Sequence, residues 1–120
     1  MSEQAIQIAT VPVGAVGTAN RALFRAPSGF GGITLQYVWL VSDTAATIVS
    51  MLANMGTALG TALVGAAIGT LTDGTLTANV RKAYTITTAY QAEGTWLGLN
   101  GVTGTIGAAS QLIVEYKFGK

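Results

Sequence analysis

The segment KAYTITTAYQAEGTWLGLN, residues 82–100, decides the fold class because its pattern predicts two strands joined by a turn. In its first half Tyr84 and Ile86 fall on one face and Thr85 on the other, an alternation typical of a half-buried strand. Gly94 supplies the turn, since glycine adopts positive φ without a Cβ penalty. The pattern predicts a hairpin. Because two strands are unstable alone in water, the rest of the chain must pack against them.

Strand-like segments also occur on both sides of this hairpin, and turn residues separate them. They are Ala5–Val11, Arg21–Ala26, Ile33–Ser42, Thr47–Asn54, a stretch near Ala62–Ile68, and Ala109–Phe118, whereas Thr70–Val80 is expected to be a loop. Regular short strands of this kind predict an all-β fold, a sandwich or barrel of about eight antiparallel strands. Residues 1–19 are expected to form an N-terminal arm, or a first strand plus a loop, and residues 20–120 the β-sandwich domain.

The composition narrows the possible functions. The chain has 120 residues, enough for one domain, and contains neither cysteine nor histidine, which argues against zinc, haem and Ser-His-Asp chemistry. The net charge of +1 gives no electrostatic footprint for nucleic acid. Charged residues make up 9% of the chain, against about 25% in an ordinary domain. The surface is therefore either threonine-rich and hydrated, or covered by other subunits.

The five carboxylates show no spacing that predicts a catalytic pair; they are Glu3, Asp43, Asp73, Glu93 and Glu115. Three of them stand beside turn residues, where acidic side chains are expected. The glycine clusters lack the Lys-Ser/Thr ending of a phosphate-binding loop. We therefore expect no enzymatic activity, no catalytic or metal site and no cofactor.

Aromatic and basic residues offer two further possibilities. Trp39 and Trp96 lie in apolar strands and are expected to pack in the core. The alternative is a sugar-stacking platform that combines them with Tyr37, Tyr84 and Tyr90. The basic residues Arg21, Arg25, Arg81 and Lys82 are expected either at solvated strand ends or in pairs with Glu93, Asp73 or Glu115 of another subunit.

One stretch of the chain offers a membrane span as an alternative to strands. Met51–Leu71 is uncharged and long enough to span a bilayer, but glycine, threonine and Asn54 dilute it and basic anchors are missing nearby. Met1–Thr10 shows no signal-peptide pattern. We therefore expect that the protein does not contact a membrane. We also expect that it is made in a cytoplasm.

The order of several motifs resembles a family of viral proteins. FGGITL at residues 30–35, a GTAL-rich middle, the segment 81–99 and EYKFGK at residues 115–120 are similar in style to small virion proteins of tailed bacteriophages, of the head decoration or cement type. The resemblance implies a β-sandwich of jelly-roll type that sits on the capsid surface as a homotrimer and binds the major capsid protein. It carries no catalytic signature.

The predicted function is therefore that of a structural virion protein that bridges major capsid subunits. The residues expected at its interfaces are Ile6, Ile8, Val11, Arg21, Arg25, Arg81 and Lys82. An N-terminal arm of this kind can add to a neighbouring sheet through main-chain hydrogen bonds. The alternatives are a carbohydrate-binding module and a tail or baseplate component.

Overall fold

The structure, a computed structural model, describes residues 5–13, 21–47, 51–57, 66–100 and 106–120. These residues form strands, turns and extended loops, and none of them lies in a helix. The strands are β1 (Gln7–Pro12), β2 (Arg21–Arg25), β3 (Ile33–Val41), β4 (Ala46–Thr47), β5 (Met51–Asn54), β6 (Ala67–Leu71), β7 (Thr75–Leu76), β8 (Arg81–Ile86), β9 (Tyr90–Gln91), β10 (Trp96–Asn100) and β11 (Gln111–Phe118). The prediction of an all-β chain is confirmed.

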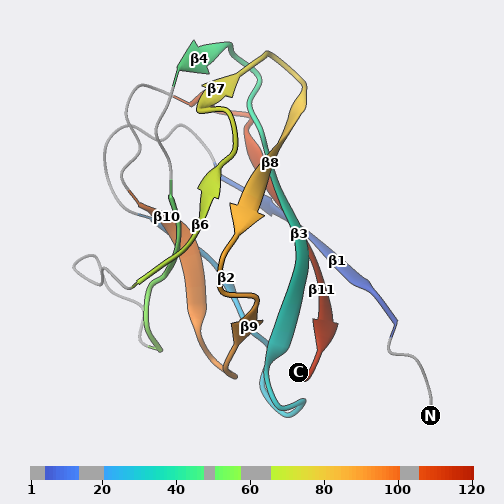
Figure 1. The fold of residues 1–120 in the computed structure, drawn as a ribbon. Helices are drawn as coiled ribbons and strands as arrows, with labels where there is room; N and C mark the ends of the chain where they lie inside the picture. The colour runs from blue at the N-terminus through green and yellow to red at the C-terminus, as the bar shows by residue number, and fades with distance from the viewer. Residues whose placement is uncertain (1–4, 14–20, 48–50, 58–65, 101–105) are drawn as a thin grey trace.

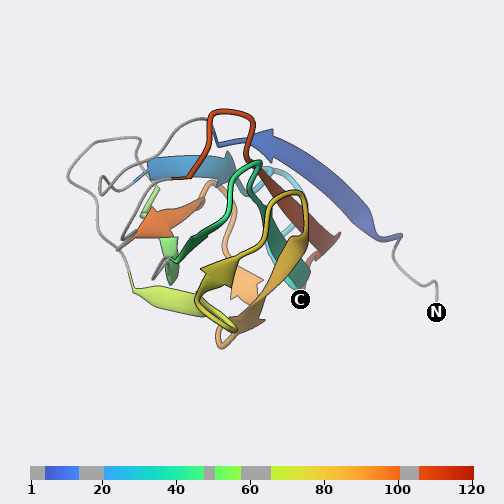
Figure 2. The ribbon, with the colours of Figure 1, turned by 90° about the horizontal axis from the view of Figure 1, so that it is seen from above.

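The main strands form two packed layers, which Figures 1 and 2 show from the side and from above. One layer has the order β1-β11-β3-β8 and the other β6-β5-β10-β2. The pairs are nested along the chain: β1 pairs with β11, β2 with β10, β3 with β8 and β5 with β6, all antiparallel. This nesting is the strand order of a jelly roll. The predicted sandwich type is therefore confirmed.

Strand β8 joins the two layers. Its first half, Arg81–Ala83, pairs with β3, and its second half, Tyr84–Ile86, pairs with β6. A strand that changes sheets in this way forms a corner of a sandwich. At the opposite side the roll is open, so that β1 and β2 are the two ends of the hydrogen-bonded path.

The predicted hairpin within residues 82–100 is wrong. Strand β8 pairs with β3 and β6, whereas β10 pairs with β5 and β2, so these two strands lie in opposite layers. The alternation correctly identified both strands, but alternation carries no information about which strand is the partner. Gly94 does have a positive φ, 76°, as the turn prediction required.

The glycine-rich middle of the chain also differs from expectation. The predicted strand Thr47–Asn54 appears as β4 and β5, with residues 48–50 outside the described part of the chain. The strand expected near Ala62–Ile68 begins at Ala67 and continues to Leu71, and the expected loop Thr70–Val80 contains β7. Strand ends are predicted from where the alternation of apolar and polar side chains stops, and a segment rich in small residues shows this alternation poorly.

Met51–Leu71, the uncharged stretch that is long enough to span a bilayer, contains β5 and β6. Within the described ranges, no helix is long and apolar enough to cross a membrane.

The core lies between the two layers. Leu40 and Leu112 from one layer and Leu52, Leu97 and Leu99 from the other are fully buried. On β11 the residues Leu112, Val114 and Tyr116 point inward, while Ile113 and Glu115 point outward. Burying a leucine contributes about 1.5–3 kcal/mol, so these contacts hold the layers together.

An irregularity in β3 decides which of its side chains face solvent. Glu115 pairs with Tyr37 and Tyr116 pairs with Leu35, so Gln36 is an extra residue in the ladder. Such a bulge reverses the inward and outward phase of the strand. Leu35 before the bulge and Val38 after it are therefore both buried, and Tyr37 is exposed.

Candidate functional site

The outward side of the β1-β11-β3-β8 layer carries several exposed apolar and aromatic side chains. We call it the outer face and define it by the residues Ile6, Ile8, Tyr37, Trp39, Arg81, Ile113 and Glu115. Three of its large apolar or aromatic side chains are well exposed: Ile6 at 50%, Ile8 at 68% and Tyr37 at 58%. Contiguous exposed apolar residues mark interaction sites more often than isolated ones do.

Trp39 lies at the centre of the outer face. Its ring stacks on that of Tyr37, with 5.4 Å between centroids and 9° between the planes. The guanidinium carbon of Arg81 lies 4.7 Å from the centroid of the Trp39 ring. Arg81 pairs with Val41, two residues beyond Trp39, so arginine and tyrosine approach the indole from opposite directions along β3.

The prediction that both tryptophans pack in the core is wrong. Trp39 and Trp96 are half-buried, and neither belongs to the buried core cluster. For Trp39 the cause is the bulge at Gln36, because strict alternation from Ile33 would have placed residue 39 inside. Trp96 begins β10 beside Arg25, at the end of its strand.

Strand β1 is an open edge of the sheet. Among the described residues it pairs with β11 alone, through six residue pairs from Gln7–Tyr116 to Pro12–Gln111. Residues 5–13 carry no charge. Edge strands are commonly protected by charged side chains, as β2 is by the exposed Arg25 at its end. Pro12 limits pairing only at the end of β1.

The structure places the apolar residues of the predicted interface on two sides of β1. Ile6 and Ile8 are exposed on the outer face. Val11 points the other way and packs against the core. Only the first two are therefore available to a partner in this conformation.

The basic residues of the predicted interface are dispersed. Arg21 pairs with Leu99 at the start of β2, and its side chain lies outside the described part. Arg25 is exposed on β2, in the other layer, and Arg81 contributes to the outer face. Lys82 donates to Asp73 of the same chain at 3.0 Å. Of these four, Arg81 alone shares a face with Ile6 and Ile8.

The Lys82–Asp73 pair ties β8 to the turn between β6 and β7. The hydrogen bond from Lys82 lowers the pKa of Asp73 from its ordinary value, because it favours the ionised carboxylate. The carboxylate is exposed to solvent, so the pair contributes little to stability. Lys82 is therefore occupied within its own chain.

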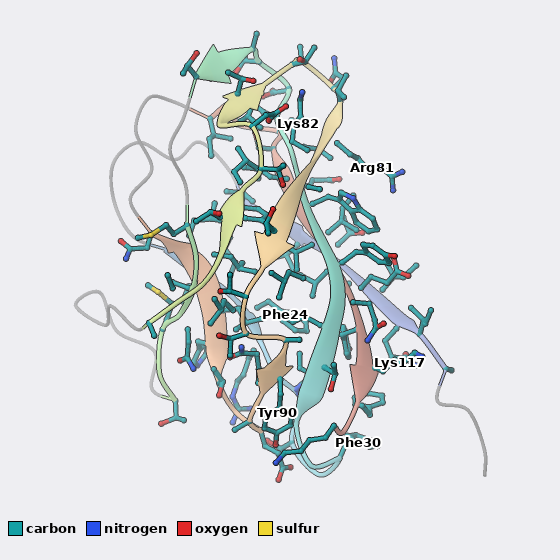
Figure 3. All side chains as sticks on the ribbon, viewed as in Figure 1. Phe24, Phe30, Arg81, Lys82, Tyr90 and Lys117 are labelled. Carbon is teal, nitrogen blue, oxygen red and sulfur yellow. The ribbon has the colours of Figure 1, made fainter. Side chains whose placement is uncertain are left out.

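Sequence reasoning missed an aromatic ladder at the other end of the molecule. Phe24 lies 5.4 Å from Tyr116, Tyr116 5.6 Å from Phe118, and Phe118 4.2 Å from Phe30, measured between ring centroids. Phe30, in a turn, is 57% exposed. Figure 3 shows it near Tyr90, at the end opposite Arg81 and Lys82. The motifs FGGITL and EYKFGK contain three of these four rings, but only the β3–β11 pairing brings them together.

The turn that carries Phe30 is held by several contacts. Glu93 accepts a hydrogen bond from the Gly29 amide, and the Tyr90 hydroxyl donates to the Gly31 carbonyl at 2.9 Å. The Gly119 amide donates to the Gly32 carbonyl at 2.8 Å. Glu93 therefore serves a structural contact in this turn.

Among the described residues, the carboxylates of Asp43, Asp73 and Glu93 accept hydrogen bonds within their own chain. Asp43 accepts a hydrogen bond from the Ala109 amide, and no group of three acidic residues in these ranges is placed to hold a metal ion. The arrangement is suited to binding through apolar and backbone contacts. Comparison of the chain with protein-family models, with curated proteins and with solved structures gave no match.

Proposed function

We propose that this chain is a non-enzymatic structural protein of a bacteriophage virion, and that it decorates the capsid surface. In this role it binds the major capsid protein as a homo-oligomer, bridges neighbouring capsid subunits and stabilises the shell. It is made in the host cytoplasm. The resemblance in sequence suggests the class of protein. The unprotected edge of β1 is the observation that supports a contact with the major capsid protein.

The edge of β1 suits a shell-bridging role for a physical reason. Its outer backbone N–H and C=O groups have no ladder partner among the described residues. A strand of a neighbouring protein that adds there gains main-chain hydrogen bonds without requiring special side chains. The exposed Ile6 and Ile8 beside this edge add apolar area to the contact. A net charge of +1 also opposes association only weakly.

Binding to expanded heads of the phage that encodes the chain tests this proposal. Ile8→Lys places a charge on the edge strand at a position that is already exposed, so the fold is retained while strand addition is opposed. Val80→Lys is the matched control, because Val80 is also an exposed apolar residue but lies outside β1. We expect co-sedimentation with heads to be lost in the first variant alone. Equal binding of both variants, or no binding of the unmodified chain, contradicts the proposal.

A tail or baseplate position would use the same edge. A cryo-EM map of the particle distinguishes the two locations, since decoration requires density for the chain on the capsid surface. Density confined to the tail would replace decoration by the tail role.

Glycan binding is a second candidate function, favoured by the outward placement of Tyr37 and Trp39. Stacking on sugar requires a free aromatic plane, and Tyr37 at 58% exposure offers one. Tyr37 and Arg81 both lie against the Trp39 ring, so less of that ring is free to stack on a sugar. If this candidate is correct, a glycan array shows binding that Tyr37→Ala abolishes. Absence of binding on the array leaves the structural role alone.

A further inference from the structure

The charges of the outer face have a symmetric arrangement about Trp39. Arg81 lies one strand away on β8, opposite Val41. Glu115 lies one strand away on the other side, on β11, opposite Tyr37. The arginine is thus two residues further along β3 from Trp39, and the glutamate two residues back. A positive and a negative side chain therefore occupy equivalent positions on opposite sides of one tryptophan.

Neither Arg81 nor Glu115 forms an ion pair within the described part of the chain, although Lys117 follows Glu115 on the outward side of β11. Arg81 contacts the Trp39 ring, and Glu115 points outward between Ile8 and Tyr37 in the register. The ion pair in these ranges joins Lys82 to Asp73 instead. The face therefore presents an aromatic centre flanked by two unpaired and opposite charges.

We infer that two copies of this chain pair through their outer faces, about a two-fold axis that passes by Trp39. An axis in the plane of the sheet, perpendicular to the line from Arg81 to Glu115, places Arg81 of each copy over Glu115 of the other. A two-fold interface must be self-complementary in this way. This inference rests on the proposed function in one respect, because the proposed homo-oligomer supplies the second copy that covers this face.

The chemistry of the patch suits such a pair. Tyr37, Trp39 and Ile113 lie at its centre, and aromatic residues at the centre of an interface contribute most of the binding energy. The two charge pairs at the rim fix the orientation of the copies. Ile6 and Ile8 lie at the rim of the outer face, whereas the backbone edge of β1 points sideways out of the sheet and remains available to a capsid strand. This contact produces a dimer, whereas the family resemblance implies a trimer.

Charge reversal tests the inference with the purified full-length chain, by sedimentation equilibrium. Arg81→Glu alone, or Glu115→Arg alone, brings like charges together at both contacts of the pair. We expect the dissociation constant of each single variant to rise at least about tenfold. An equimolar mixture of the two variants restores both contacts in a mixed pair, so we expect affinity within about threefold of the unmodified chain, a small energetic difference. Restoration also shows that both variants fold.

The control is Arg25→Glu, which makes the same substitution at an exposed arginine of the other layer. We expect it to associate as the unmodified chain does. Single variants that associate normally, a mixture that stays dissociated, a three-copy mass, or an unmodified chain that remains monomeric at about 1 mM each overturn the inference. The proposed function is judged separately, by binding to heads: a chain that pairs by this rule but ignores heads contradicts the function alone.

Discussion

Gly32→Ala gives the sharpest test of the packing at the end of the molecule that carries Phe30. Gly32 has a φ of 88°, and a Cβ there would lie 2.6 Å from the carbonyl oxygen of Gln91 and 2.7 Å from the Tyr90 hydroxyl. Gly31, its neighbour, has a φ of 75° but has no atom within 4 Å of its would-be Cβ. The two glycines therefore share the backbone penalty and differ only in the close approach.

The magnitude follows from these two terms. An alanine in the left-handed region costs about 1–2 kcal/mol, which applies to both positions. Crowding against backbone that cannot move freely costs a further 1–3 kcal/mol or so, which applies to Gly32 alone. We expect the free energy of unfolding to fall by about 1–2 kcal/mol in Gly31→Ala and by about 2–5 kcal/mol in Gly32→Ala.

Urea unfolding followed by circular dichroism measures both values on the same scale. The difference between the two variants isolates the contact of Gly32 with β9, because the conformational term cancels. If both variants lose the same free energy, the close approach to Gln91 is wrong and the Phe30 turn is held less tightly than described.

Three other substitutions probe the core, the corner of the roll and the acidic turn. Leu40→Ala removes a fully buried side chain and should lower the free energy of unfolding by about 2–5 kcal/mol, whereas Val41→Ala, on the outward side, should cost about 1 kcal/mol or less, both by urea titration. Gly69→Ala places a Cβ 2.8 Å from the Thr85 carbonyl oxygen at the β6–β8 junction and should cost about 1–3 kcal/mol; a neutral effect would disprove that approach. Asp73→Asn should be slightly less stable than the unmodified chain near neutral pH, because the lowered pKa of Asp73 stabilises the fold above the ordinary value of 3.8. This difference should disappear as the pH falls through the lowered pKa, and a difference that grows in acid would contradict the sign.

The sequence predicted the elements whose pattern is local. On β11 the alternation of Leu112 and Val114 with Ile113 and Glu115 identified the strand and separated its two sides. The strand from Ile33 was predicted correctly in position, because a long run of apolar and β-branched residues between turns favours a central strand. The number and spacing of such segments predicted a sandwich or barrel, and the jelly-roll type came from the family resemblance.

The errors arose where the outcome depends on distant residues. The hairpin failed because the partners of β8, which are β3 and β6, come earlier in the chain than the turn at Gly94. Trp39 was expected inside because the bulge at Gln36 depends on the β3–β11 register. Of the expected interface, Ile6, Ile8 and Arg81 lie together on the outer face, whereas the stack of Tyr37 on Trp39 could be found only after that phase was known.

The position of β1 beside β11 also determines how the molecule bears a mechanical load. Gln7 pairs with Tyr116, so the beginning of the first strand lies against the final residues of the last one, as Figure 1 shows. Tension applied to the two chain ends would open this ladder like a zipper, one pair after another, at low force. Tension transmitted sideways through a strand attached along β1 would instead act on all six pairs of that ladder at once. The same ladder is thus weak when the chain ends are pulled apart and strong when the whole of β1 is pulled sideways.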